Sequence, residues 1–375
     1  MESVKNFFKK IPGFITNFSL KNSSTNTKII GLCVIILIIL GIVIYIRNQN
    51  NDKLCKLLQQ LYDTKPPLIS VVDSPTQSVY SLRDFYIKTA YNCCCLKKDA
   101  VDLCALSACI GQGARCLDFQ IYANVNDNKP VVAISPIDSY KINASDKYIS
   151  IEKVLTIINN QAFSSGTCPN FNDPLILHFR ISSNNIDLYN NLADDIRVIL
   201  NQRVLGPEYS NQYNNRNLGA LPISTFNQKI IVMIDASNPI YRKTKLFEYI
   251  NAASGTPFLH LQRYNQIKYT QDLNLANFNK ENMTIVLPDL RVSNKNPNFN
   301  IPNEYGCQML GMSFWNSDEN LTAYNNFFNA ARFAFALKPE KLRYVQATIN
   351  IPNPLPKEYS YSPRKISGDF YNFQI

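Results

Sequence analysis

The feature that most constrains this chain is an uncharged run at residues 29–46, IIGLCVIILIILGIVIYI. As a helix the run would be about 27 Å long, close to the roughly 30 Å hydrocarbon core of a bilayer. A buried core helix, the first alternative, is seldom apolar on every face. A cleaved signal peptide, the second, would end in small residues rather than in Tyr45-Ile46-Arg47. The run therefore predicts one transmembrane helix ahead of a large folded region.

Cations on either side of this run predict its orientation. The preceding segment, 1–28, carries Lys5, Lys9, Lys10, Lys21 and Lys28, and the following segment begins with Arg47, Lys53 and Lys56. The positive-inside rule places 1–28 in the cytoplasm and the large region across the membrane. In a secretory lumen, the acceptor sequences at Asn143, Asn282 and Asn320 would then be glycosylated.

The overall charge is basic, with 38 Lys and Arg against 28 Asp and Glu and a net charge of +10. These cations are scattered and form no basic stripe interleaved with aromatic residues, which argues against a nucleic-acid partner. General attraction to anionic surfaces is the better interpretation. We expect the membrane as a partner through 29–46, an anionic phospholipid surface or a protein as a further partner, and no nucleic acid.

Ten cysteines include one in the apolar run and the triplet Cys93-Cys94-Cys95. A metal cluster there is disfavoured, because no C-x-x-C pair and no neighbouring histidine accompanies the triplet. Buried free thiols are the expected state for most of them. Disulfides remain open for a domain outside the cytoplasm, where the nine remaining cysteines would leave at least one unpaired.

Short apolar runs alternate with helical stretches beyond residue 80. This order, with eight strands, predicts a parallel α/β architecture closed into a barrel. The predicted strands are 85–89, 115–122, 130–134, 175–181, 229–235, 257–261, 283–287 and 307–314. The predicted helices are 100–111, 151–161, 185–202, 243–252 and 321–336.

Two of these strands carry polar residues along one face. Asp118 and Gln120 alternate with apolar residues in the first, and His178 and Arg180 do so in the second. Strands of an α/β barrel are normally apolar on both faces. The pattern indicates a polar lumen at one barrel end, where such folds hold their sites. The solvated face of an antiparallel sheet stays open as an alternative.

Six short motifs occur in the order known from one enzyme family. They are YIKTAYN at 86–92, GARCLD at 113–118, DPLIL at 173–177, LPIS at 221–224, GCQM at 306–309 and FALKPEKLR at 335–343. Together they resemble both barrel halves of phosphoinositide-specific phospholipase C, from about Leu82 to Arg343. The resemblance implies a distorted TIM (β/α)8 barrel and, in the family, phosphoric diester hydrolysis on lipids.

The resemblance also sets the expected domain layout. Following a cytoplasmic tail at 1–28 and the transmembrane helix at 29–46, we expect a stalk and entry segment at 47–80. The first barrel half is 81–205, the short connection 206–219, the second barrel half 220–345 and the C-terminal tail 346–375. The connection replaces the long regulatory linker of the eukaryotic family.

The departures from the family concern its chemistry. The family uses two histidines and a calcium ion held by Asn, Glu, Asp and Glu. Resemblance places Tyr91 and Ser135 at the histidine positions, and Asn92, Asp118, Gln120 and Arg180 at the calcium-ligand positions. The substrate positions are lost to Met233, Asp235, Ile285 and Leu287. No catalytic residue is therefore assigned, no cofactor is expected, and Asn92 and Asp118 are weak candidates for a metal.

Arg180 is the most informative departure. A guanidinium keeps its charge at physiological pH and repels calcium, so we predict that it pairs with Asp118, with Asn92 assisting. The only two histidines, His178 and His260, match neither catalytic position. His178 is expected to be buried and hydrogen-bonded in the lumen; a new acid–base pair with His260 is the alternative.

Three functions follow from these observations. The first is a membrane-tethered, non-enzymatic barrel that binds a ligand or partner. The second is an active phosphodiesterase with a rebuilt site, which would need Ca²⁺. The third is a structural protein, such as a component of the membrane of a large DNA virus, to which the composition is suited. Hydrolysis of a phosphoinositide separates the second function from the others.

Overall fold

The computed structural model describes residues 25–97, 100–124, 126–135, 148–270, 274–290, 295–345 and 362–375, without the side chains of 25–31 and 42–50. The predicted tail 1–28, except its last four residues, and the acceptor Asn143 lie outside the described residues. The chain forms two compact units, Met1–Arg343 and Tyr344–Ile375.

The first unit is built on a row of eight parallel strands in the order β10-β11-β12-β1-β4-β7-β8-β9. No ladder joins the two ends of the row, β9 and β10, in the described residues, so the barrel is nearly closed with one seam. The strands are β1 (Phe85–Ala90), β4 (Cys116–Ala123), β7 (Leu175–Ile181), β8 (Ile230–Asp235), β9 (Ala252–Ser254), β10 (Leu259–Arg263), β11 (Met283–Leu287) and β12 (Met309–Met312).

Seven of the predicted strands belong to this barrel, but the prediction for 130–134 as a barrel strand was wrong. That segment forms β5 (Pro130–Val132), which turns back antiparallel on β4 and pairs with β6 (Ile149–Ser150). The eighth barrel strand is β9, of which only Ala252 falls in the predicted helix 243–252, while residues 253 and 254 were predicted in no element. Instead of that helix, two 3₁₀ segments, η9 (Pro239–Lys243) and η10 (Lys245–Tyr249), bury Tyr241 and Leu246.

The predicted helix 321–336 likewise contains two elements. Helix α10 (Glu319–Ala331) ends at Arg332, whose φ of 62° is left-handed, and β13 (Phe335–Leu337) then pairs antiparallel with β1. An arginine gives no sequence signal for a left-handed helix end, because glycine and asparagine are the usual residues there.

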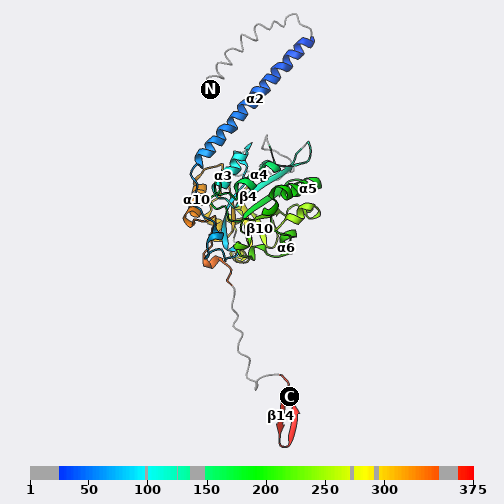
Figure 1. Cartoon of the computed structure of the whole chain (residues 1–375), viewed down its shortest axis with the longest axis vertical. Helices are drawn as coiled ribbons and strands as arrows, with labels where there is room; N and C mark the ends of the chain where they lie inside the picture. Colours follow the sequence, from blue (N-terminus) through cyan, green and yellow to red (C-terminus); the bar gives the residue numbers. More distant parts are fainter. Residues whose placement is uncertain are drawn as a thin grey trace. The chain divides into compact units, whose positions relative to one another are not determined.

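Helices surround the barrel, and Figure 1 shows α3, α4, α5 and α10 around the strands. Side-chain caps fix several starting points: Asp102 accepts from Cys104, Asn185 from Asp187 and Asp318 from Leu321. The helices are α3 (Leu103–Gly111), α4 (Ile151–Gln161), α5 (Ile186–Asp195) with a π-helical turn η4 (Ile196–Leu200), α6 (Ser210–Asn215), α7 (Tyr264–Lys268), α8 (Asn274–Glu281) and α9 (Asn300–Glu304).

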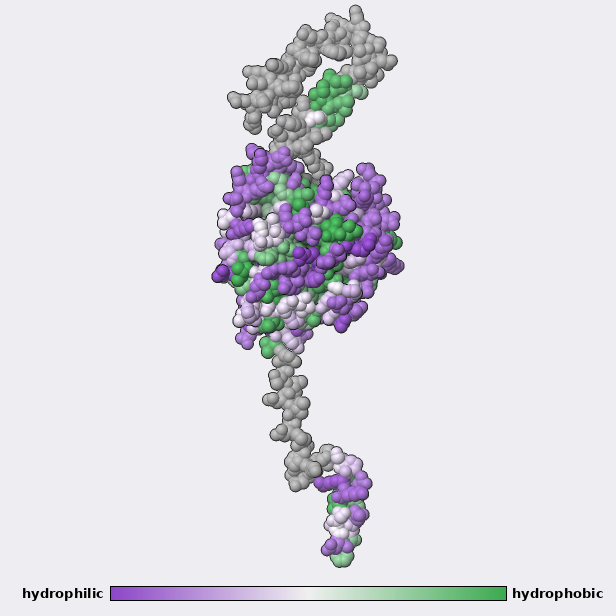
Figure 2. Space-filling view, in the orientation of Figure 1, coloured by the Kyte–Doolittle hydropathy of each residue, from purple (hydrophilic) through white to green (hydrophobic). Residues whose placement is uncertain are grey.

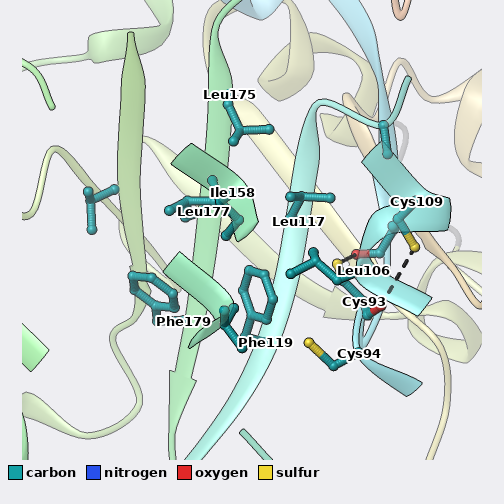
Figure 3. Packing of buried hydrophobic residues seen from close by; sticks show 14 of the residues in the cluster. Cys93, Cys94, Leu106, Cys109, Leu117, Phe119, Ile158, Leu175, Leu177 and Phe179 are labelled. Carbon is teal, nitrogen blue, oxygen red and sulfur yellow. Dashed lines mark hydrogen bonds between the residues drawn. The ribbon is translucent and has the colours of Figure 1, made fainter. Parts of the chain in front are cut away.

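Strand alternation divides the core into two layers, because successive side chains point to opposite faces. Figure 3 shows the outer layer, where Leu117, Phe119, Leu177 and Phe179 of β4 and β7 pack with Ile158 of α4. The inner layer fills the lumen with the alternate residues, including Cys116, Ile176, Ile231, Met233, Ile285 and Met309. Because polar residues share this inner face on β4 and β7, they are directed into the barrel as predicted.

Helix α2 (Thr25–Leu61) contains the expected membrane span 29–46. Its described apolar side chains, from Leu32 to Leu40, are exposed, and they form a continuous hydrophobic surface in Figure 2. Among the described residues, no helix is both long enough and apolar enough to cross a membrane. The last turns of α2 are attached to the barrel: Cys55 forms a disulfide with Cys104, and Leu58 packs with Ala105.

The remaining described cysteines are free, and all of them except Cys33 are buried, as expected for most of these thiols. In the part of the chain that the structure describes, one group of side chains lies close enough to hold a metal: Cys55, Asp102 and Cys104. Two of its three members are joined in the disulfide, so it lacks free thiolates.

The second unit contains a two-stranded antiparallel hairpin, β14 (Lys365–Gly368) and β15 (Tyr371–Gln374). Phe370, at its turn, and the side chains of Tyr371 and Phe373 are exposed.

Candidate functional site

The candidate site lies in the lumen toward the carboxyl ends of β1, β4 and β7. Asp118 is in register with His178, and Gln120 with Arg180, on neighbouring parallel strands. Asn92 follows β1 with a positive φ of 46°, and its backbone N–H donates to Asp118 Oδ2 at 3.2 Å. The fold therefore brings together Asn92, Asp118 and Arg180 from three strands.

Arg180 binds both of its predicted partners. Its Nε donates to Asp118 Oδ1 at 2.9 Å, and its Nη2 donates to Asp118 Oδ2 at 2.8 Å and to Asn92 Oδ1 at 2.7 Å. Asp118 is fully buried, and only 6 % of the Arg180 side chain is exposed. The two parallel bonds match the planar guanidinium to the carboxylate, which is the strongest arrangement of such a pair.

At both Asp118 and Arg180, the opposite charge determines the direction of the pKa shift and burial opposes it. Burial alone would raise the pKa of Asp118, but the Arg180 charge and the hydrogen bonds from His178 and Arg180 hold that pKa well below its usual range. Burial would lower the pKa of Arg180, whereas the Asp118 carboxylate raises it above its ordinary value. Both groups are therefore charged at physiological pH.

Tyr91, at the first histidine position, supports the guanidinium. The Arg180 Cζ lies 5.0 Å from the centre of the Tyr91 ring, within the range of a cation–π contact. Gly311 on β12 leaves room for this arrangement, because a Cβ there would lie 3.1 Å from the Cβ of Tyr91.

Gln120 and Ser135 are joined by a hydrogen bond. The backbone N–H of Ser135 donates to Gln120 Oε1 at 3.1 Å, and both residues are buried. This bond attaches the end of the β5 segment to β4. The side-chain oxygen of Gln120, at one of the calcium-ligand positions, is therefore already engaged.

These donors do not fit a calcium ion. A calcium site gathers six to eight oxygen ligands around the ion. Both Asp118 oxygens and the Asn92 oxygen bind Arg180, Gln120 Oε1 binds Ser135, and a fixed positive charge lies among them. The arrangement is a closed ion pair supported by hydrogen bonds.

Comparison with known proteins supplies a fold but no close relative. No protein-family model and no curated protein matches the chain. The crystal structure of S. officinalis PLC21 is similar with a TM-score of 0.58 and 15 % identity, covering 74 % of this chain and 39 % of that one. L. pealei PLC21 gives 0.57 and 16 %, covering 72 % and 38 %.

The barrel has a phospholipase C-like phosphodiesterase fold. This agrees with the resemblance found in the motifs. The chain spans about two fifths of the length of the two PLC21 chains. At 15 % and 16 % identity the likeness establishes the fold and leaves the activity to the site.

His178 of this phospholipase C-like barrel is buried in the lumen and bonded at both ring nitrogens, as the sequence predicted. Its Nδ1 lies 2.8 Å from Asp118 Oδ1, and its Nε2 lies 2.9 Å from Ser254 Oγ. The order Asp118–His178–Ser254 is that of an acid, a base and a nucleophile. However, all three residues are fully buried, and Asp118 also binds Arg180, so the Ser254 hydroxyl is not presented to a substrate.

Ser254 was not among the predicted site residues, because residues 253–256 were predicted in neither a strand nor a helix. A signal was available in the following residue, Gly255, which has a φ of 83°. A glycine that follows small residues marks a break in regular structure, which indicates that a short element ends at this place.

His260 lies on the other side of the barrel wall. Its neighbours on β10, Leu259 and Leu261, pack into the lumen cluster, so His260 faces outward. There its ring stacks on Phe278 of α8, with centroids 3.7 Å apart. The alternative of a new acid–base pair between His178 and His260 is therefore wrong.

The four substrate positions form no cationic cluster. Met233, Ile285 and Leu287 are buried in the apolar lumen cluster. Asp235, at the end of β8, is half-buried and accepts a hydrogen bond from the backbone of Ser237 at 2.9 Å. The lumen surface at these positions is thus apolar or acidic, which does not suit a phosphorylated headgroup.

Proposed function

We propose that this chain is a membrane-anchored phospholipase C-like barrel that does not cleave phosphodiesters and acts as a binding or structural protein. One observation carries the proposal: the Arg180 guanidinium binds both Asp118 and Asn92. A metal ion in such a place would polarise the phosphate and lower the pKa of the attacking group. A guanidinium supplies positive charge but has no open coordination position.

The two histidine positions also hold residues that are poorly suited to proton transfer. Hydroxyl and phenol groups hold their protons through neutral pH, whereas an imidazole exchanges its proton there. Tyr91 and Ser135 stand at the two histidine positions of the resemblance. His178 is fully buried, and Asp118 and Ser254 engage both of its ring nitrogens.

The anchor is the second part of the proposal. It is supported by the uncharged run 29–46 and by the exposure of the apolar side chains from Leu32 to Leu40. The disulfide between Cys55 and Cys104 supports a location of the barrel outside the cytoplasm, with 1–28 inside, because disulfides persist in oxidising compartments. The net charge of +10 favours an anionic lipid surface as a partner.

Two assays on the wild-type protein test the loss of catalysis. Calorimetry with calcium chloride should detect no site of about millimolar affinity or tighter. Phosphatidylinositol vesicles should remain uncleaved with calcium present, under conditions in which an active phospholipase C cleaves them. Calcium-dependent turnover that disappears in His178→Gln would overturn the proposal and establish the active phosphodiesterase instead.

Binding and structural roles are separated by a further measurement. Saturable binding to vesicles that carry one headgroup, compared with vesicles of equal charge, indicates a ligand-binding protein. Binding that follows vesicle charge alone indicates a structural membrane protein, the form expected of a viral envelope component.

A further inference from the structure

A second candidate site lies at the seam of the barrel, away from the Arg180 ion pair. There the structure contains a pocket of about 190 Å³ between the β9–β10 segment and residues 212–219. Its lining includes Arg216, Asn217, Gly219, Arg242, Leu259 and Met283. The pocket lies beside the place where β9 and β10 form no ladder in the described residues.

The inner part of the pocket is apolar. Leu218, Ala253, Leu259 and Met283 line it and are buried. Gly219 packs closely against the lining, because a Cβ there would lie 3.1 Å from Asn217 Oδ1 and 3.2 Å from two atoms of the Met283 side chain. Since an apolar cavity of about 150 Å³ accepts benzene, this pocket can hold a body the size of one ring.

Asn217 contributes an unused acceptor. Its Nδ2 donates to the backbone oxygen of Glu281 at 2.8 Å and to Asn282 Oδ1 at 3.1 Å, which fixes the orientation of the carboxamide. Its Oδ1 is buried and has no hydrogen-bond partner among the described residues. A buried acceptor left unsatisfied costs about 1–3 kcal/mol, so a ligand hydroxyl or N–H that reached this oxygen would be favoured.

Two arginines stand at the exposed rim. The Arg216 guanidinium lies over the Tyr213 ring at 4.2 Å, and Arg242 Nε donates to the Tyr241 hydroxyl at 3.3 Å. Within the described ranges neither arginine forms an ion pair with a carboxylate. Guanidinium groups bind carboxylate and phosphate through paired N–H donors.

One wall of the pocket has a strained backbone. Five consecutive residues, 211–215, have φ between 51° and 57°, although none is glycine. The left-handed conformation costs roughly 1–2 kcal/mol per residue, with a smaller penalty for asparagine. Gln212 N–H donates to the Ile250 oxygen at 2.7 Å, and Asn251 Nδ2 donates to the Tyr209 oxygen at 3.0 Å, which hold the turn. Strain of this kind clusters at ligand sites.

We propose that this pocket binds a small organic anion with a one-ring apolar body and a hydroxyl group. The body packs on Leu259 and Met283, the hydroxyl donates to Asn217 Oδ1, and the carboxylate or phosphate lies between Arg216 and Arg242. The proposal depends neither on the state of the Arg180 ion pair nor on the membrane anchor.

Calorimetry on the full chain tests it with 4-hydroxybenzoate and 4-hydroxyphenyl phosphate as probes. Benzoate lacks the hydroxyl and phenol lacks the charge, and each should bind about tenfold more weakly than 4-hydroxybenzoate. Arg216→Gln and Arg242→Gln should each weaken the hydroxylated anions about tenfold. Both arginines are exposed, so these variants should fold. Arg197→Gln, an exposed arginine outside the pocket, is the matched control and should leave binding unchanged.

Three results would overturn the proposal. They are no binding of either hydroxylated anion at about 10 mM, equal affinity for 4-hydroxybenzoate, benzoate and phenol, and an equal loss in Arg197→Gln and Arg216→Gln. Better binding of 4-hydroxyphenyl phosphate than of 4-hydroxybenzoate would assign the site to phosphates, and the reverse would assign it to carboxylates.

Discussion

Two buried cations in this barrel differ in whether a carboxylate lies against them. Arg180, in the lumen, lies against the carboxylate of Asp118, and this pairing raises its pKa although burial opposes it. Lys88, on the outward face of β1, donates from Nζ to the backbone oxygen of Gln112 at 2.8 Å. Burial lowers the pKa of Lys88 to about 7.

Lys88 and Arg180 differ because only Arg180 has a carboxylate against it. Within the described residues Lys88 forms no ion pair, and its Nζ lies 6.0 Å from the centre of the Phe314 ring. Lys338 is similar, since its Nζ donates to the Asn279 oxygen and burial lowers its pKa to about 7. The lumen therefore holds a permanent ion pair, whereas the outer layer holds lysines that lose their charge near neutral pH.

Removing the lumen cation should have the largest effect. Arg180→Ala should lower the free energy of unfolding by about 3–5 kcal/mol, because it leaves Asp118 buried without its counter-charge. Arg180→Glu should lower it further, since a second carboxylate would then face Asp118. Urea denaturation of the purified protein measures both. Arg197→Ala, an exposed control, should change the value by less than about 0.5 kcal/mol; a similarly small loss in Arg180→Ala would show that the ion pair contributes nothing.

Acid should weaken the lumen pair in a defined range. The pKa of Asp118 is lowered in the folded protein, so its contribution is fully present above about pH 4, the unfolded value, and is lost as the pH falls below it. The stability difference between the wild type and Asp118→Asn should therefore be constant from pH 7 to about pH 4 and shrink at lower pH. Denaturation series at each pH measure it, and a difference that persists unchanged at low pH would contradict the lowered pKa.

Raising the pH above neutral should stabilise the folded protein through the two buried lysines, Lys88 and Lys338. Between about pH 7, the folded pKa, and about pH 10.5, the unfolded one, the unfolded chain binds more protons, so stability rises with pH. Each lysine contributes about 1 kcal/mol per pH unit in the middle of that range. Lys88→Met should raise stability at pH 7 and remove its share of the slope, whereas the exposed control Lys153→Met should leave the slope intact.

The smallest effect is expected at Tyr91. Its ring contributes a cation–π contact to Arg180, worth about 1 kcal/mol, while the hydrogen bonds to Asp118 remain. Tyr91→Leu should lower the free energy of unfolding by about that amount in urea denaturation. Tyr91→Phe keeps the ring and is the matched control. A loss approaching that of Arg180→Ala would mean that the ring, rather than the carboxylate, holds the guanidinium.

Much of this barrel can be predicted from local patterns in the sequence. Strand alternation directs Asp118, His178 and Arg180 to one face of β4 and β7, because successive side chains of a strand point to opposite sides. Opposite charges on neighbouring inward faces then predict the pair that Asp118 and Arg180 form. The order of the motifs predicts the barrel fold. The 130–134 segment shows, however, that a strand pattern does not reveal whether the strand runs parallel or antiparallel to its neighbour.

Tertiary structure decided what depends on contacts between distant segments. Ser254 reaches His178 only because β9 lies beside β8, and the short, small-residue segment that forms β9 carries no strand pattern of its own. The buried position of Lys88, whose Nζ meets Gln112 at the end of α3, and the pocket beside the seam likewise depend on segments that are distant in the sequence. Sequence periodicity specifies which face of an element is apolar, whereas the packing of several elements determines which polar atoms become enclosed and what they meet there.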